Sequence, residues 1–168
     1  KKTNRWESGD AGQIHRTGHR EGVRLTRAGA LDRIDVLLST ITDPAFVAVV
    51  RAEPLALAGT PILAFWVQSR TPGWQTLSDI GSTTTIMVRA YFRMQPSTDV
   101  RETIEAQVWD AMVEIETKLR SDANLDGNVT DSVVGSAQVQ YLTIEASVYR
   151  VVTVPFDVQI YEEITITP

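Results

Sequence analysis

The stretch TIMVRAYFRMQPSTDVRETIEAQVWDAMVEIETKLR (residues 85–120) decides the fold, because it joins a strand pattern directly to a helix pattern. Its first nine residues alternate, which predicts a strand with one buried side and one side in water. After Pro96, apolar residues recur every three or four positions and predict an amphipathic helix packed against the sheet. The predicted buried positions are Ile86, Val88, Ala90 and Phe92 in the strand, and Val100, Ile104, Val108, Ala111, Ile115 and Leu119 in the helix.

A second, smaller apolar patch lies on nearly the opposite side of the same helix pattern. It consists of Ala106, Trp109 and Val113 among glutamates. An exposed tryptophan gives a monomer no stability, so we predict that this patch contacts another chain.

The part of the chain before residue 62 carries a helix signal and one ambiguous stretch. Residues 26–41 have apolar positions at helical spacing, and Asp43-Pro44 ends that helix because proline disfavours a helical residue before it. Residues 46–51 are too short to classify, and they fit a further helical turn or, as their valines favour, a strand.

Residues 62–68 are nearly all apolar and predict a central strand covered on both faces. Residues 69–82 include Thr71-Pro72-Gly73 and predict a long loop between two strands.

Two strands are predicted near the end of the chain, at residues 137–144 and 148–161. Pro155 cannot donate to a ladder, so it predicts that the last strand is an edge strand or carries a bulge. The elements together predict an α+β fold. We expect a mostly antiparallel sheet of four to five strands, two main helices on one face, a long loop between strands and an extended basic N-terminal arm.

Length and composition predict one domain, because 168 residues with 43% hydrophobic content suffice for a single core. We place an arm at residues 1–22, which hold few apolar residues, and the domain at residues 23–168. No apolar run approaches the length of about 18–20 residues that a membrane helix needs, so no membrane contact is expected.

Charge divides the chain into a basic start and an acidic remainder. Residues 1–27 carry seven Lys or Arg against three acids, a local +4 that leaves −9 for the rest of a chain of net charge −5. The start can bind DNA phosphates or an acidic neighbouring subunit, and both interpretations stay open. The candidate contact residues in it are Trp6, Arg16, Arg20 and Arg24.

The sequence predicts no catalytic centre, cofactor or metal. Cysteine is absent, and both histidines, His15 and His19, lie in the basic arm, so no histidine is available as the base for a serine in the rest of the chain, and triad chemistry would need an unusual lysine. The segment Asp122–Asp131 begins like a calcium loop of the EF-hand type, but Val133 stands where that loop needs a carboxylate. A turn between helix and strand is the favoured interpretation, and a calcium-dependent binding module is the alternative.

The order of these elements resembles the tail terminator, or tail completion, proteins of long-tailed, siphovirus-like bacterial viruses. The resemblance covers roughly residues 25–163, and it is carried by the helix end KLRSD, the turn LDGNVTD and the closing pair VQYLTIEASVYRVVTVPFDVQIYEE. The motifs are patterns rather than rigidly spaced catalytic signatures. The long segment before residue 23 departs from the smallest family members.

This resemblance implies a structural virion protein at the junction of tail and neck, assembled in the host cytoplasm. Copies would form a hexameric ring on the last ring of tail tube protein, stop its growth and offer a surface to head–tail connector, or neck, proteins. Genomic DNA would pass through the lumen without specific binding. Another neck or tube protein of the same virion is the alternative. The further ring-contact candidates are Trp74 in the expected loop, and Pro155 and Tyr161 in the expected C-terminal edge strand.

Overall fold

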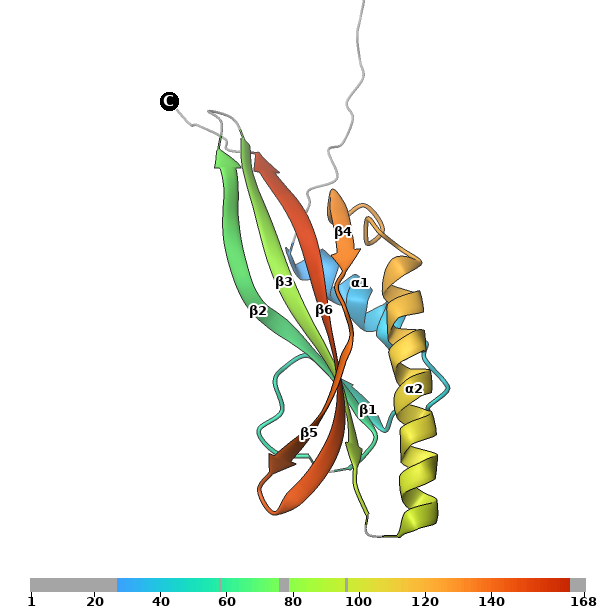
Figure 1. Cartoon of the computed structure of the whole chain (residues 1–168). Helices are drawn as coiled ribbons and strands as arrows, with labels where there is room; N and C mark the ends of the chain where they lie inside the picture. Colours follow the sequence, from blue (N-terminus) through green and yellow to red (C-terminus); the bar gives the residue numbers. More distant parts are fainter. Residues whose placement is uncertain (1–26, 58, 76–78, 96, 164–168) are drawn as a thin grey trace, which may run out of the picture.

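The computed structural model describes residues 27–57, 59–75, 79–95 and 97–163, which form two helices and six strands (Figure 1). No helix in those ranges is long and apolar enough to cross a membrane. The elements are, in chain order, α1 (Arg27–Ser39), β1 (Ala48–Val50), β2 (Ile62–Gln75), β3 (Asp79–Arg93), α2 (Thr98–Arg120), β4 (Asp131–Val134), β5 (Gln138–Ile144) and β6 (Ser147–Glu163).

The strands form one mixed sheet in the order β1-β2-β3-β6-β4, with β5 also paired to β6. β1 runs parallel to β2, and all other neighbours are antiparallel. β3 pairs with one edge of β6, from Tyr149 to Glu163. On the other edge of β6, β4 pairs with residues 156–159 and β5 pairs with residues 147–153. The sheet is therefore built around β6.

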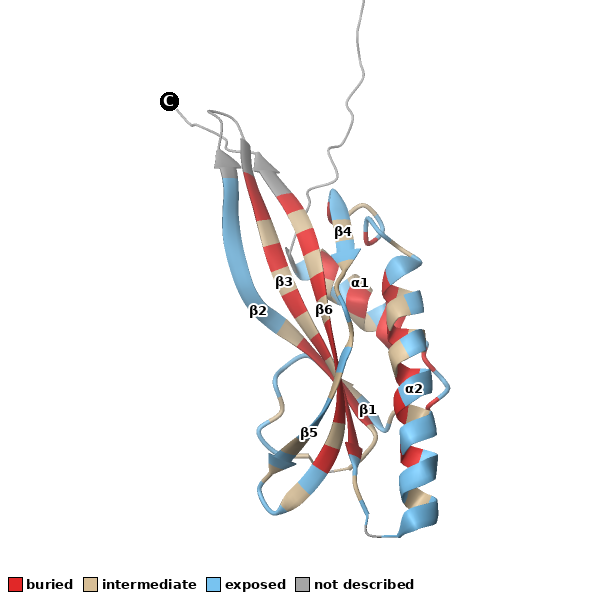
Figure 2. Ribbon diagram, viewed as in Figure 1, coloured by how far each residue is buried: buried red, intermediate tan, exposed pale blue. Residues whose placement is uncertain are grey.

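Both helices pack on one face of this sheet and share a core with it, as the sequence predicts (Figures 1 and 2). Side chains of β3 and β6 are alternately buried and partly exposed, because successive residues of a strand point to opposite faces. The predicted stripe of α2 is buried from Ile104 to Leu119, and Val100 packs at its margin. The buried positions of α1 are Ala30, Ile34, Leu37 and Leu38, and Ile41 is buried just after the helix ends.

The side of the 85–93 strand that carries Tyr91 was predicted to lie in water, and this is wrong at Tyr91. Tyr91 is 1% exposed and Tyr149 is 6% exposed in a second, smaller cluster that includes Ala64 and Val151. The segment after β1 brings Leu57 against this cluster. Burial raises the pKa of the Tyr91 hydroxyl, since the charged phenolate is less stable away from water.

The predicted long loop at residues 69–82 is also wrong, because β2 and β3 run on as a hairpin through most of that stretch (Figure 1). Pro72 is opposite Ser82 in the ladder, within the part of β2 that has only β3 as a neighbour. A proline on an open edge removes no ladder hydrogen bond, so it is tolerated there. Gly73 lets the strands approach, since a Cβ on it would lie 3.1 Å from the carbonyl oxygen of Gly81.

The described sheet has six strands rather than the predicted four to five. The additional strand is β4, whose four residues pair with β6 beside the predicted C-terminal strands. Four residues are too few for a period to be read from the sequence.

Candidate interaction surfaces

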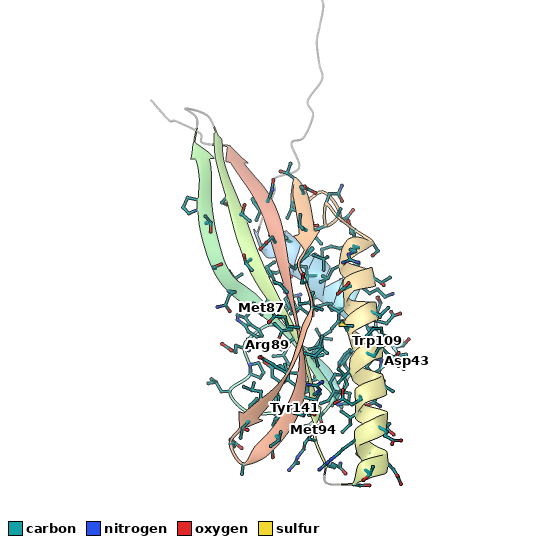
Figure 3. All side chains as sticks on the ribbon, in the orientation of Figure 1. Asp43, Met87, Arg89, Met94, Trp109 and Tyr141 are labelled. Carbon is teal, nitrogen blue, oxygen red and sulfur yellow. The ribbon has the colours of Figure 1, made fainter. Side chains whose placement is uncertain are left out.

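Trp109 lies on the outer side of α2, within the apolar patch that the sequence predicts (Figure 3). Trp109 is 64% exposed and Val113 is 44% exposed, and Ala106 is exposed as well. Their spacings of three and four residues put them on one line along the helix, on the side away from its buried stripe. The structure brings these three residues together on a surface that no other described residue covers.

Two carboxylates lie near this patch on the same helix. Glu102 precedes Ala106 by one helical turn, and Asp110 follows Trp109 directly. Both are exposed, and neither forms an ion pair with the described residues, whereas Glu105 on the same helix pairs with Arg150 at 2.9 Å. We call the set Glu102, Ala106, Trp109, Asp110 and Val113 the Trp109 surface, an apolar centre with negative charge beside it.

The sheet ends in two different open borders. On one side, β1 covers only Ile62 to Ala64 of β2, so residues 65–75 have no outer strand among the described parts of the chain. On the other side, β5 pairs with β6 along one edge, and its other edge has no neighbouring strand among the described parts of the chain. Open strand edges present unpaired backbone groups that another strand can bind.

The C-terminal strand is not the edge strand that was predicted. Pro155 lies in β6, which has β3 on one side and β4 and β5 on the other. On the second side the pairing of β4 ends with Val134 opposite Phe156, and the pairing of β5 begins with Gln138 opposite Thr153, so Pro155 lies at the break between them. The carbonyl oxygen of Pro155 accepts the N–H of Gly135 at 2.8 Å, so its nitrogen also faces this interruption. Pro155 therefore lies at an interruption of the ladder on one side of β6, while the pairing of β6 with β3 continues through it, and the residue is not available as an open edge.

The remaining interface candidates are only partly described. The backbone of Trp74 lies in β2 rather than in a loop, and Tyr161 is opposite Gly81 in the ladder. The side chains of both lie outside the described part of the structure. Trp6, Arg16, Arg20 and Arg24, and with them the predicted arm, lie outside the described residues.

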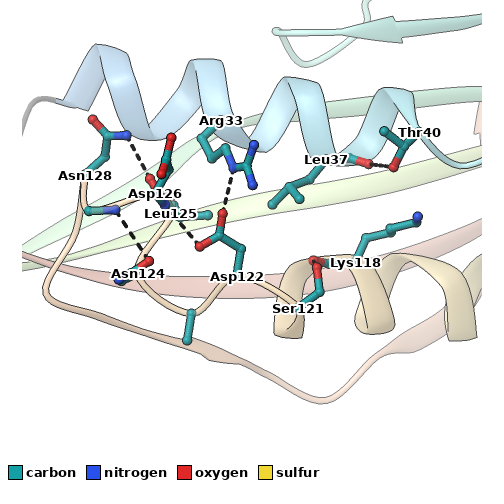
Figure 4. A network of polar contacts seen from close by, with 12 residues as sticks. Arg33, Leu37, Thr40, Lys118, Ser121, Asp122, Asn124, Leu125, Asp126 and Asn128 are labelled. Carbon is teal, nitrogen blue, oxygen red and sulfur yellow. Dashed lines mark hydrogen bonds and ion pairs between the residues drawn. The ribbon is translucent and has the colours of Figure 1, made fainter.

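The Asp122 segment is a turn held against α1 (Figure 4). The guanidinium Nε of Arg33 lies 2.6 Å from Oδ2 of Asp122, and Oδ1 accepts the backbone N–H of Asp126 at 3.0 Å. Burial would raise the pKa of the Asp122 carboxyl, but these hydrogen bonds outweigh it and hold the pKa below its ordinary value. Leu125 anchors the turn in the core with 0% exposure.

This geometry favours the turn over the calcium loop. The carboxylate that would open a calcium loop is already in contact with a positive guanidinium, which would repel a cation. Within the described ranges, no group of three or more His, Cys, Asp or Glu side chains is placed to hold a metal ion.

The sequence did not predict the apolar groove that lies near the hairpin. The groove lies between the start of α1 and the sheet, and the hydroxyl of Thr84 beside it is buried without a hydrogen-bond partner in the described structure. Of the lining residues, only Arg70 lies in the expected loop at residues 69–82, so the groove depends mainly on how the start of α1 packs on the sheet, which a local sequence pattern does not show. The lining residues are Ala30, Leu31, Val67, Arg70, Thr84, Ile86, Val158 and Ile160.

Comparison of the chain with models of known protein families and with curated proteins found no match in either.

Proposed function

We propose that this chain is a structural subunit of a bacterial virus that assembles into a ring, capping the tail tube as tail terminators do. The observation that carries the proposal is Trp109, a tryptophan 64% exposed on the outer side of the longest helix. The core is complete without it, since the buried stripe of α2 lies on the other side. Large exposed aromatic side chains are typical anchors of protein interfaces.

Different surfaces on opposite sides of the chain support a ring rather than a symmetric dimer. The open border of β2 and the open border of β5 are different strands of one sheet, so one copy can use the first and its neighbour the second. Such head-to-tail contacts between unlike surfaces form rings when the rotation between copies closes. A terminator must also match the growing tube on one side of the ring and fail to reproduce it on the other.

The charge of the chain is compatible with a ring through which DNA passes. The sequence outside residues 1–27 carries −9, and acidic walls repel phosphates and so avoid adhesion of the genome. On this proposal the partners are tail tube protein on one side and neck proteins on the other. The site of action is the junction of tail and neck, after assembly in the host cytoplasm.

Negative-stain electron microscopy of the pure full-length protein tests the proposal. We expect closed rings of uniform diameter and hexameric symmetry. Long tubes would instead identify the protein as a tube subunit of the same virion. A protein that stays monomeric at high concentration in sedimentation would overturn the proposal.

The substitution Trp109→Ala should weaken ring formation by about 2 kcal/mol or more, roughly a 30-fold rise in the concentration at which rings form. The reason is that a central aromatic anchor is lost while the monomer core is untouched. Sedimentation velocity over a concentration series measures this shift. The control is Val36→Ala, which alters an apolar residue that is 54% exposed on the other helix. Unchanged assembly with a lower melting temperature would place Trp109 in the core.

A further inference from the structure

We propose that the Trp109 surface of one copy binds the basic N-terminal segment, residues 1–24, of a second copy. The surface offers an aromatic ring and carboxylates that form no ion pair with the described residues, and the segment offers guanidinium and ammonium groups. This inference rests on the proposed function in one respect, because it takes the neighbouring copy of the ring as the partner.

The receptor side has the chemistry that selects a cation. Trp109 presents its ring to solvent, Asp110 follows it directly and Glu102 lies two helical turns before it on the same helix; neither carboxylate has an ion pair in the described structure. An arginine over a tryptophan face is attracted by the ring and can reach a carboxylate at the same time. The same chain already uses arginines in this way, with Arg89 lying 5.1 Å from the Trp66 ring centre and Arg150 lying 4.5 Å from that of Tyr141.

The ligand side has the matching charge and composition. Residues 1–24 hold six Lys or Arg against three acids, whereas the chain beyond residue 27 carries −9. Arg16, Arg20 and Arg24 recur every four residues, and Trp6 and Ile14 add apolar groups. A basic segment and an acidic, tryptophan-centred face on one chain are unlike surfaces, which is what contacts around a ring require.

Reach does not limit the contact. A segment of this length spans up to about 80 Å when extended, far more than the width of a neighbouring subunit of this size. The choice of a second copy over the same copy follows from the ring, in which each subunit must both give and receive a contact.

A binding assay with an isolated segment tests the inference. The probe is a dye-labelled synthetic peptide of residues 1–24. The receptor is the full-length chain with Arg16, Arg20 and Arg24 all changed to Gln, so that its own segment does not compete. Fluorescence anisotropy at low salt should show saturable binding that weakens as salt is added, because charged contacts are screened.

Variants of the receptor locate the contact. Trp109→Ala should weaken peptide binding about tenfold or more, and Glu102→Gln with Asp110→Asn should weaken it and reduce its salt dependence. The control Val36→Ala should leave the affinity unchanged. Absence of binding, or an affinity that Trp109→Ala does not alter, would overturn the inference.

The two proposals fail in different ways. If wild-type protein forms rings but the peptide does not bind, the inference is wrong and the ring stands. If the peptide binds through Trp109 while wild-type protein forms no rings, the contact stands and the ring function is wrong.

Discussion

Arg33 and Asp122 connect α1 to the turn that follows α2, at 2.6 Å between Nε and Oδ2. The pair is partly shielded, with the side chains 34% and 13% exposed, so water screens it less than an ion pair on the open surface. Three further turn residues, Leu125, Asp126 and Gly127, have positive φ angles. The pair therefore fixes a turn whose backbone is otherwise unfavourable.

Replacing Asp122 with Asn should lower the free energy of unfolding by about 1–2 kcal/mol at pH 7, because a charged hydrogen bond is lost. The pKa of the Asp122 carboxyl is lowered in the folded protein, so its contribution is present above the ordinary carboxyl pKa and disappears as pH falls through the folded value. Urea titrations at pH 7 and at acid pH should show the difference between wild type and variant shrinking. Asp110→Asn, which alters an exposed carboxylate that forms no ion pair with the described residues, is the control. A difference that stays constant down to strong acid would contradict this account.

Gly135 lies where the ladder along β6 is interrupted, close against Pro155. A Cβ on Gly135 would lie 2.7 Å from Cγ of Pro155 and 3.2 Å from its carbonyl oxygen. Gly135→Ala should therefore destabilise the protein by about 1–3 kcal/mol through overpacking. Thermal unfolding followed by circular dichroism measures the effect.

Gly59 provides the matched control, since its Cβ would meet only Cγ1 of Val47 at an ordinary 3.6 Å. Gly59→Ala should change stability by no more than about 0.5 kcal/mol. Adding Pro155→Ala to Gly135→Ala should recover part of the loss. Equal effects at both glycines would show that the contact with Pro155 is not the cause.

At the scale of elements, the hairpin of β2 and β3 is the largest difference between the structure and the loop that the sequence predicts at residues 69–82. β3 lies between β2 and β6, so hydrogen bonds are available on both of its edges, whereas β2 beyond Ala64 is paired on one edge only. Backbone amides in β3 should therefore exchange with solvent far more slowly than those of the outer part of β2.

Hydrogen exchange with mass spectrometry checks this expectation. Peptides covering residues 82–93 should stay protected for hours, those covering residues 66–73 should exchange in part, and the irregular segment at residues 51–57 should exchange at once. Complete exchange of residues 69–82 within minutes would restore the loop that the sequence suggested.

The helices could be predicted from sequence and the hairpin could not, for a physical reason. Helix α2 repeats its apolar positions over 23 residues, so the face that packs is repeated many times in the pattern. Thr71-Pro72-Gly73 is typical of a turn when only local preference is considered. It lies in a strand here because β2 has an open edge at that point, which is a property of the sheet and not of the tripeptide.

The same limit applies to the candidate surfaces. Helical spacing alone predicted that Trp109 and Val113 lie opposite the core, and the structure places them there. The position of Pro155 depends on which strands flank β6, and these pairings join residues far apart in the chain. A proline in a strand pattern is therefore compatible with an edge strand or with a bulge, and only the pairing of the strands distinguishes these two interpretations.

At the scale of the whole molecule, the residues that the structure describes form a core among themselves. The buried residues of both hydrophobic clusters lie between Ala30 and Ile160, and each contacts others within the described structure. The basic start contributes charge, and on our proposal its role is contact between copies rather than folding of one.

Deletion of residues 1–22 should therefore leave a folded chain whose free energy of unfolding differs from wild type by less than about 1 kcal/mol, since the core of the described residues begins at Ala30. Near-ultraviolet circular dichroism and urea unfolding, at concentrations below those of ring formation, measure this. Ile115→Ala, at a fully buried position of α2, serves as the comparison and should cost about 2–5 kcal/mol. A truncated chain that keeps its helical signal but loses its aromatic signal would show that the segment is part of the core and that the boundary at residue 22 is wrong.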